Sequence, residues 1–328
     1  MATATGDILR LVRKGIDVRT VHANTRKPFR FYLCGDPALV AEMRAFLLDG
    51  NNAEGVPLDA AACLETIVPG VAQPTITQEA RLVLFLGRGG DVSGTAMQPL
   101  RALNLPIIAI TVDEAAQPSG PTSVPARGTF AEYTVASISR EALRGRVLPH
   151  IVECCKGVEI AVGRRLPGLR ESVAAKLTRD AANNALKVAL ASAVVDHIPV
   201  VGLVMGVFAS AGDMMAITGI QMMLMLHIEA TYGKDPDVQR MWQLLPVIGG
   251  GFGWRSLARE LSGFIPVAGI AIKGAIAYAG TIVVGEGVAF YYEQGRHMSA
   301  GQAKSIYEQT KNEAMTFARD LLRRVTNR

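Results

Sequence analysis

The apolar stretch from Val194 to Gly287 limits what this chain can fold into more than any other part of its sequence. It holds two long runs with few charges, VVDHIPVVGLVMGVFASAGDMMAITGIQMMLMLHIEATYG and FIPVAGIAIKGAIAYAGTIVVGEG, which a more polar connection separates. Exposing apolar surface to water costs roughly 25 cal/mol per Å². The stretch must therefore form the core of a helical domain or lie against a lipid bilayer.

Only the second run contains a segment long enough to cross a bilayer. The pieces Asp196–Asp213 and Met214–Leu226 of the first run fall short of the ~20 residues that a transmembrane helix needs. Phe264–Val284 reaches that length, although Lys273 at its centre costs roughly 2.5–3.5 kcal/mol on insertion. We expect membrane association, as a hairpin that dips into or spans the bilayer. The alternative is a soluble helical domain, packed closely through Gly269, Gly274 and Gly280.

Length, charge and cysteine usage narrow the class of protein. The 328 residues suffice for two domains, and only 19% are charged, below the ~25% of typical soluble domains. The net charge of +5 includes no block of like charges, so we expect no nucleic-acid partner and consider an anionic membrane surface a better fit. The cysteines lack metal-ligand spacing, which predicts reduced thiols, a cytosolic compartment and no metal: Cys34, Cys63, Cys154 and Cys155.

Residues 1–24 form a basic segment without the long apolar core of a signal peptide. Apolar and basic side chains alternate there at helical spacing: Ile8, Arg10, Leu11, Val12, Arg13 and Lys14. We expect a short amphipathic helix packed on the first domain, with a membrane anchor as the alternative.

The segment from 25 to 163 alternates strand-like and helix-like patterns. Apolar runs predict strands at 29–35, 62–70, 81–86, 105–114 and 130–139, and the intervening sequence predicts helices at 37–50 and 95–104. Strands this apolar are typical of a parallel sheet covered on both faces. The sequence therefore predicts a three-layer α/β domain of the kind that binds nucleotides.

The phosphate-binding loop of such a domain is missing. A P-loop needs GxxxxGK[ST] after the first strand, because the second glycine admits the phosphates, the lysine neutralises them and the hydroxyl binds magnesium. Counting from Gly35, those three positions hold Val40, Ala41 and Glu42. No GxGxxG stands there either, which excludes a dinucleotide fingerprint. We expect no nucleotide cofactor.

The turn GRGGDVSG, residues 87–94, is a weak candidate for an anion site. Backbone N–H groups of a glycine-rich turn after a strand can form an anion-binding nest. The cofactor candidates are Gly87, Arg88, Gly89 and Gly90. Asp91 within the turn opposes an anion, and glycines that serve only the turn are the alternative reading.

Long helices follow, and the sequence predicts a break near Pro167. The glycine-rich segment 249–253 opens a helix with Arg255 and Arg259, where a lipid headgroup would bind unless the glycines form only a hinge. Lys273 is the third membrane candidate. Ser299 and Gln302 form a capping box that begins the last, amphipathic helix.

The second half resembles the YcjF-like helical domain of unknown function, which accompanies Era-type GTPases of the Ras-like fold in bacteria. The resemblance covers roughly residues 164–295. It rests on Pro199, Asp213, Gln221, Tyr232–Gly233, Arg255, Pro266, Gly269, Gly280–Thr281, Gly285 and Tyr292. Ser137 and Ile138 fall near the place of the guanine-proximal loop of the GTPase domain.

This resemblance implies GTP binding upstream and membrane association downstream. The chain departs from the family at the phosphate loop and has no Asn-Lys-x-Asp motif after LPIIAIT, so no GTPase residue is carried over. We expect a degenerate GTPase-like domain at 25–163 and a YcjF-like helical domain at 164–328. The expected function is a non-catalytic interaction or scaffold protein at the bacterial inner membrane, with an unidentified protein partner. A divergent nucleotide hydrolase and a soluble helical adaptor are the alternatives.

Overall fold

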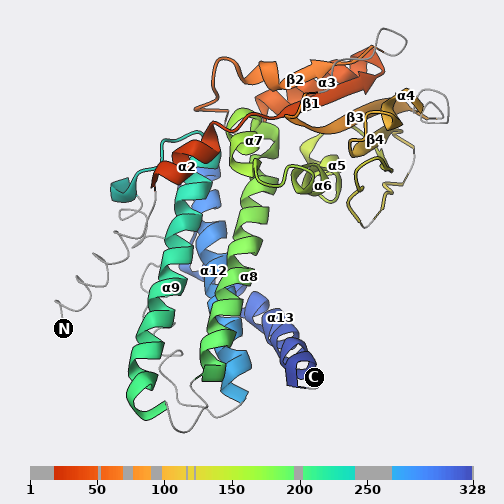
Figure 1. Ribbon diagram of the computed structural model, residues 1–328. Coiled ribbons are helices and arrows are strands. Elements are labelled where there is room, and N and C mark those ends of the chain that lie inside the picture. The colour runs from red at the N-terminus through yellow and green to blue at the C-terminus, as the bar shows by residue number, and fades with distance from the viewer. Residues whose placement is uncertain are drawn as a thin grey trace. The chain divides into compact units, whose positions relative to one another are not determined.

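The chain divides into two compact units. The computed structural model describes residues 18–50, 53–68, 77–89, 98–115, 117–121, 123–195, 202–240 and 268–326. The α/β unit comprises His22–Lys176 and Ala230–Lys234, and the helical unit comprises Met1–Val21, Leu177–Glu229 and Asp235–Arg328. Figure 1 labels the elements of both units.

Five parallel strands in the order β2-β1-β3-β4-β5 form the sheet of the α/β unit. They confirm the five strands that the sequence predicts: β1 (Arg30–Gly35), β2 (Leu64–Thr66), β3 (Ala80–Arg88), β4 (Ile107–Val112) and β5 (Phe130–Val135). The chain leaves β1 toward β2 on one side and later continues through β3 on the other. This order reverses direction between β1 and β3, which makes their carboxyl ends the topological switch point.

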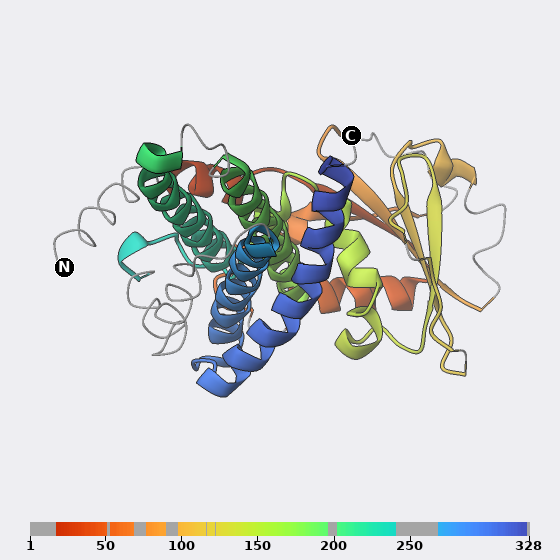
Figure 2. The same ribbon diagram turned by 90° about the horizontal axis from the view of Figure 1, so that it is seen from below.

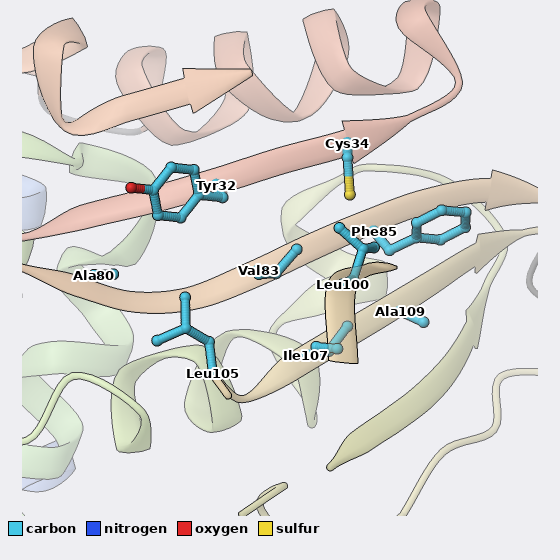
Figure 3. Close-up of a cluster of buried hydrophobic side chains, with 9 residues drawn as sticks. All are labelled: Tyr32, Cys34, Ala80, Val83, Phe85, Leu100, Leu105, Ile107 and Ala109. Atoms are coloured by element: carbon cyan, nitrogen blue, oxygen red, sulfur yellow. The ribbon is translucent and has the colours of Figure 1, made fainter. Parts of the chain in front are cut away.

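The central strands are buried on both faces, which explains their continuous apolar sequences. In β3 the side chains from Leu82 to Leu86 are at most 3% exposed. One face carries a cluster from β1, β3, β4 and the helix α4 (Gln98–Arg101), shown in Figure 3: Tyr32, Cys34, Ala80, Val83, Phe85, Leu100, Leu105, Ile107 and Ala109. A helix-flanked parallel sheet is therefore present as expected.

Short helices complete the α/β unit. They are α2 (Val18–Thr25), whose first residues belong to the helical unit, α3 (Pro37–Asp49), η1 (Ala60–Cys63), α5 (Arg140–Leu143), α6 (Val147–Glu153), α7 (Glu159–Arg165) and η2 (Pro167–Leu169). The predicted break near Pro167 is confirmed, because α7 ends at Arg165 and α8 begins at Arg170. Pro167 opens the intervening η2 turn, where its missing N–H costs nothing.

Four long helices lie wholly or largely in the described part of the helical unit: α8 (Arg170–Val195), α9 (Gly202–Thr231), α12 (Ala268–Gln294) and α13 (Ala300–Thr326). The first turns of α8, up to Lys176, and the end of α9, from Ala230, belong to the α/β unit. The sequence divides the first apolar run at Asp213, but α9 is one helix of 30 residues. A single aspartate and scattered glycines weaken a helix by about 1 kcal/mol each and do not end it when its surroundings hold it in place. That division was wrong.

Small residues bring α8, α9 and α12 together. Ala185 and Ala189 of α8 form a buried cluster with Ala277 of α12, against which α9 packs Ile217 and Ile220. A Cβ atom on Gly285 would lie 2.1 Å from Oγ1 of Thr178, so α12 approaches α8 closely there. Of the glycines that the sequence predicts at such contacts, Gly274 meets α8, because an added Cβ would lie 2.7 Å from Leu186.

The helices α12 and α13 lie side by side (Figure 2). Gly295, with φ of +64°, ends the first of them in a left-handed conformation that glycine adopts without strain. The predicted capping box is confirmed at the start of α13. The Ser299 N–H donates to Oε1 of Gln302 at 3.0 Å, and the Gln302 N–H donates to Oγ of Ser299 at 3.2 Å.

One helical segment in the described part of the chain, Ile272–Gln294, has the length and apolar composition to cross a membrane. Within its most apolar window, 61% is already buried inside the protein, as in the core helix of a soluble protein. It overlaps the predicted segment Phe264–Val284, whose first four residues lie outside the described residues.

Replacing Gly35 with alanine tests the close contact between β1 and β3. Its φ is +113°, and an added Cβ would lie 1.9 Å from the Leu86 carbonyl oxygen. We expect Gly35→Ala to lower the free energy of unfolding by at least about 2 kcal/mol, measured by urea unfolding followed by circular dichroism. Gly89→Ala is the matched control, because nothing lies within 4 Å of its added Cβ. Equal stabilities of the two variants would contradict this account.

Candidate functional site

The switch point between β1 and β3 is the first place to look for a ligand. In open parallel sheets, ligands bind outside the carboxyl ends of the strands where the strand order reverses. Here Gly35 and Asp36 follow β1, and Gly87 and Arg88 end β3. The Asp36 N–H donates to the Leu86 carbonyl oxygen at 2.8 Å, which binds the two strand ends together.

The N-terminus of α3, where a P-loop protein would hold its phosphates, is occupied by the chain's own carboxylate. Oδ1 of Asp36 accepts the N–H groups of Ala38 at 2.8 Å and Leu39 at 3.0 Å. Pro37 has no N–H to offer. The donors that attract an anion to a helix N-terminus are thus already used, and the aspartate supplies the negative charge that favours this position.

Arg88 balances this charge. Its Nε lies 3.8 Å from Oδ2 of Asp36, and 59% of the Arg88 side chain is exposed. An ion pair this exposed contributes little to stability. It nevertheless partly neutralises Arg88, the cation that the sequence predicts for an anion site. Gly87 pairs with Thr111 in the ladder between β3 and β4, so it belongs to the strand.

The remaining sequence candidates lie elsewhere. Gly89 follows β3 directly, whereas Gly90 lies outside the described residues. Lys273 is half-buried on α12, and Arg255 and Arg259 lie outside the described residues. Of the three membrane candidates, only Lys273 belongs to the described residues.

A buried arginine that the sequence analysis missed organises a second cluster, within the α/β unit. Arg170, 1% exposed, donates from Nε to the Gly163 carbonyl oxygen at 3.1 Å and from Nη2 to the Glu54 carbonyl oxygen at 2.9 Å. Its guanidinium lies over the ring of Tyr232, 5.7 Å from the centroid. Burial lowers the pKa of Arg170 to about 10, so it stays charged at neutral pH.

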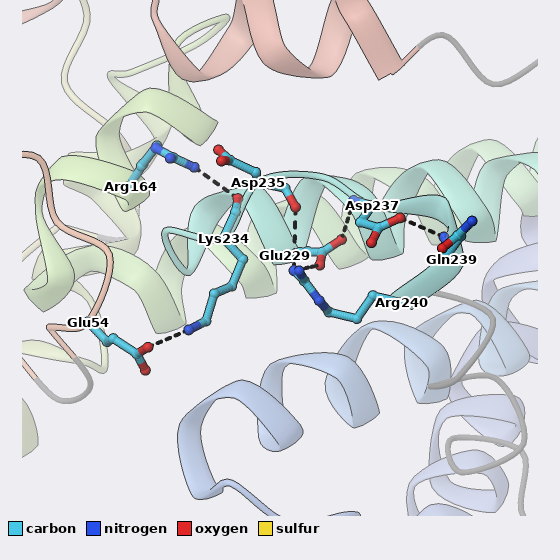
Figure 4. A network of polar contacts seen from close by, with 8 residues as sticks. All are labelled: Glu54, Arg164, Glu229, Lys234, Asp235, Asp237, Gln239 and Arg240. Atoms are coloured by element: carbon cyan, nitrogen blue, oxygen red, sulfur yellow. Dashed lines mark hydrogen bonds and ion pairs between the residues drawn. The ribbon is translucent and has the colours of Figure 1, made fainter.

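Two glycines allow two backbone segments near Arg170 to approach each other closely. Gly55 and Gly233 have φ of +74° and +83°, and a Cβ on either would lie within 2.7 Å of the other's carbonyl oxygen. Lys234 fixes the outer edge, because its Nζ lies 2.6 Å from Oε1 of Glu54 and its carbonyl oxygen accepts from Arg164 at 2.9 Å (Figure 4). The segment Ala230–Lys234 is thereby bound to residues far away in the sequence.

Only one part of this cluster can be singled out from the sequence alone. Tyr232–Gly233 belongs to the blocks on which the family resemblance rests. Arg170 lies in RRLPGLRES among other arginines, and no spacing distinguishes it from an exposed residue.

The thiols and the metal-ligating side chains offer little chemistry. Burial raises the pKa of Cys34, Cys63 and Cys154 to about 12 and that of Cys155 well above 9.0, so the reactive thiolate is scarce at neutral pH. Among the residues whose positions are described, no group of three or more His, Cys, Asp or Glu side chains could hold a metal ion.

Comparison of the chain with models of protein families, with curated proteins and with solved structures finds no match.

Replacing the buried arginine tests whether it holds the α/β unit together. We expect Arg170→Met to lower the free energy of unfolding by about 3 kcal/mol, because the buried Gly163 carbonyl loses its donor and the Glu54 carbonyl loses a second one. Urea unfolding measures this loss. Lys234→Met, which removes the exposed ion pair with Glu54, is the matched control and should leave the unfolding midpoint unchanged. Equal effects of the two substitutions would refute the central role of Arg170.

Proposed function

We propose that this protein is a non-catalytic interaction protein with a degenerate GTPase-like α/β unit, associated with the cytoplasmic face of the bacterial inner membrane. One observation carries the first part: Asp36 caps α3 with its own carboxylate where a nucleotide-binding protein of this topology would place its phosphates. The strand order of the sheet is typical of ligand-binding proteins. The Asp36 carboxylate, however, occupies the helix N-terminus where a phosphate would bind.

The residues around the cap support the same conclusion. A triphosphate carries several negative charges, and binding one requires a lysine and a magnesium ligand close to the helix N-terminus. The P-loop positions hold Val40, Ala41 and Glu42 instead. Val40 is buried and Glu42 is exposed in the second turn of α3, so neither a cation nor a hydroxyl faces the switch point from these positions.

The membrane part of the proposal rests on the composition of α9 and α12. Both helices are apolar on all sides, which is typical of helices buried in a protein core or placed against lipid. The basic residues 255, 259 and 273 would meet anionic headgroups. The soluble helical adaptor remains the competing function, because 61% of the apolar window in Ile272–Gln294 is already covered by protein.

Nucleotide titration tests the first part. We expect isothermal titration of the full chain with GTP or ATP and magnesium to show no binding at micromolar concentration, and phosphate release assays to show no hydrolysis. Asp36 excludes the phosphates by repulsion at close range. Micromolar binding with turnover would refute the proposal. In that event Arg88→Ala decides whether the turn after β3 is the site, since hydrolysis that Arg88→Ala leaves unchanged would exclude it.

Vesicle flotation tests the second part. We expect the full chain to float with vesicles that contain about 30% phosphatidylglycerol, and to float much less with purely zwitterionic vesicles, because basic residues near a membrane surface contribute about 1 kcal/mol each. The variant Arg255→Ala/Arg259→Ala should reduce flotation, and Arg323→Ala/Arg324→Ala is the charge-matched control. A monodisperse protein that floats with neither type of vesicle would favour the soluble adaptor.

A further inference from the structure

A buried carboxylate in the helical unit makes contacts that neither the family resemblance nor the proposed function uses. Glu229, in the last turns of α9, is 2% exposed. Its two carboxylate oxygens bind different partners: Oε1 lies 2.5 Å from Nη1 of Arg240, and Oε2 accepts the Asp237 N–H at 3.1 Å (Figure 4).

Further hydrogen bonds form within the segment of residues 235–240. Nη1 of Arg240 also donates to the Asp235 carbonyl oxygen at 3.4 Å, and Oδ1 of Asp237 accepts the Gln239 N–H at 2.8 Å. The hydroxyl of Tyr292, on α12, also faces the Glu229 carboxylate. Among the described residues, the groups that face Glu229 are thus Asp237 and Arg240 of the segment and Tyr292 of α12.

We propose that Glu229 and Arg240 form a pH-sensitive latch, which holds residues 235–240 against the bundle at neutral pH and releases them on acidification while the bundle stays folded. The contacts with the Asp237 N–H and with the guanidinium both favour the charged carboxylate. A neutral carboxyl group still accepts the Asp237 N–H, but it loses the strong attraction to Arg240, whose side chain is 41% exposed and is solvated once released.

The sign of the pH effect follows from burial. Burial raises the pKa of Glu229 above its ordinary value of 4.5, and the contacts with Asp237, Arg240 and Tyr292 offset only part of this rise. A carboxyl group with a raised pKa in the folded state stabilises the fold most fully at low pH and loses that contribution as pH rises through the folded-state pKa. Protonation of Glu229 therefore opens the latch without a cost to the folding of the bundle.

Hydrogen exchange of the full chain at several pH values tests the latch. After correction for the intrinsic pH dependence of exchange, protection of residues 235–240 should fall about tenfold as pH decreases from about 8 to 4, with a midpoint above 4.5. Protection around Gln221 in the middle of α9 should stay constant. Glu229→Gln should show low protection of 235–240 at every pH. Glu286→Gln, which removes an exposed carboxylate of α12, is the matched control and should titrate like the wild type.

Two results would overturn the latch: protection of residues 235–240 that does not change with pH in the wild type, or full protection in Glu229→Gln. Should Glu229→Gln fail to fold, Arg240→Met replaces it. That variant keeps the buried carboxylate and removes only its cation, so it should lose protection at neutral pH and match the wild type at acidic pH. If Arg240→Met keeps wild-type protection at neutral pH, the latch is refuted.

Discussion

The contact between the ends of β1 and β3 determines the rest of the α/β unit. Because Gly35 has no side chain, the backbone passes directly against Leu86, and the Asp36 N–H binds the Leu86 carbonyl oxygen. This contact fixes where α3 begins and aims the Asp36 carboxylate at its first turn. At the other end of α3, Gly50 meets Gly168 so closely that an added Cβ would lie 2.4 Å away. The position of η2, and of Arg170 after it, follows from the placement of α3.

The two charged side chains that are buried among the described residues, Arg170 and Glu229, both form hydrogen bonds with backbone groups. Arg170 donates to two carbonyl groups, and Glu229 accepts a backbone N–H beside its arginine partner. A buried charge costs several kcal/mol unless it is hydrogen-bonded, and backbone groups in turns provide such partners without side-chain entropy loss. The two charges flank the same short stretch, because Arg170 fixes Ala230–Lys234 and Glu229 fixes 235–240. Polar contacts therefore hold the chain after α9 in addition to the burial of Ala230 and Tyr232.

The sequence predicts the elements of this fold better than it predicts the groups that hold them. Short, largely apolar runs predict all five strands, and Ser299 with Gln302 predicts the start of α13, because these signals are local. The sequence alone also shows that the phosphate loop is absent, because its three key positions hold Val40, Ala41 and Glu42. Only the folded structure shows that the Asp36 carboxylate caps α3 where a P-loop protein would hold its phosphates. In the sequence, an aspartate before a proline is simply a common helix start. Arg170 and Glu229 have no periodicity, and only the folded chain brings their partners near.

The charges on α12 weigh against the passage of this apolar helix through a membrane. Glu286 is exposed near the middle of Ile272–Gln294, and Lys273 is half-buried near its start. Each charge at the centre of a membrane costs roughly 2.5–3.5 kcal/mol on insertion scales. The polar contact between Gln221 and Thr281, at 3.2 Å, turns other polar atoms inward between α9 and α12. With its buried face packed against protein and a carboxylate on its exposed face, α12 is less suited to crossing a membrane than its length and apolar composition alone indicate.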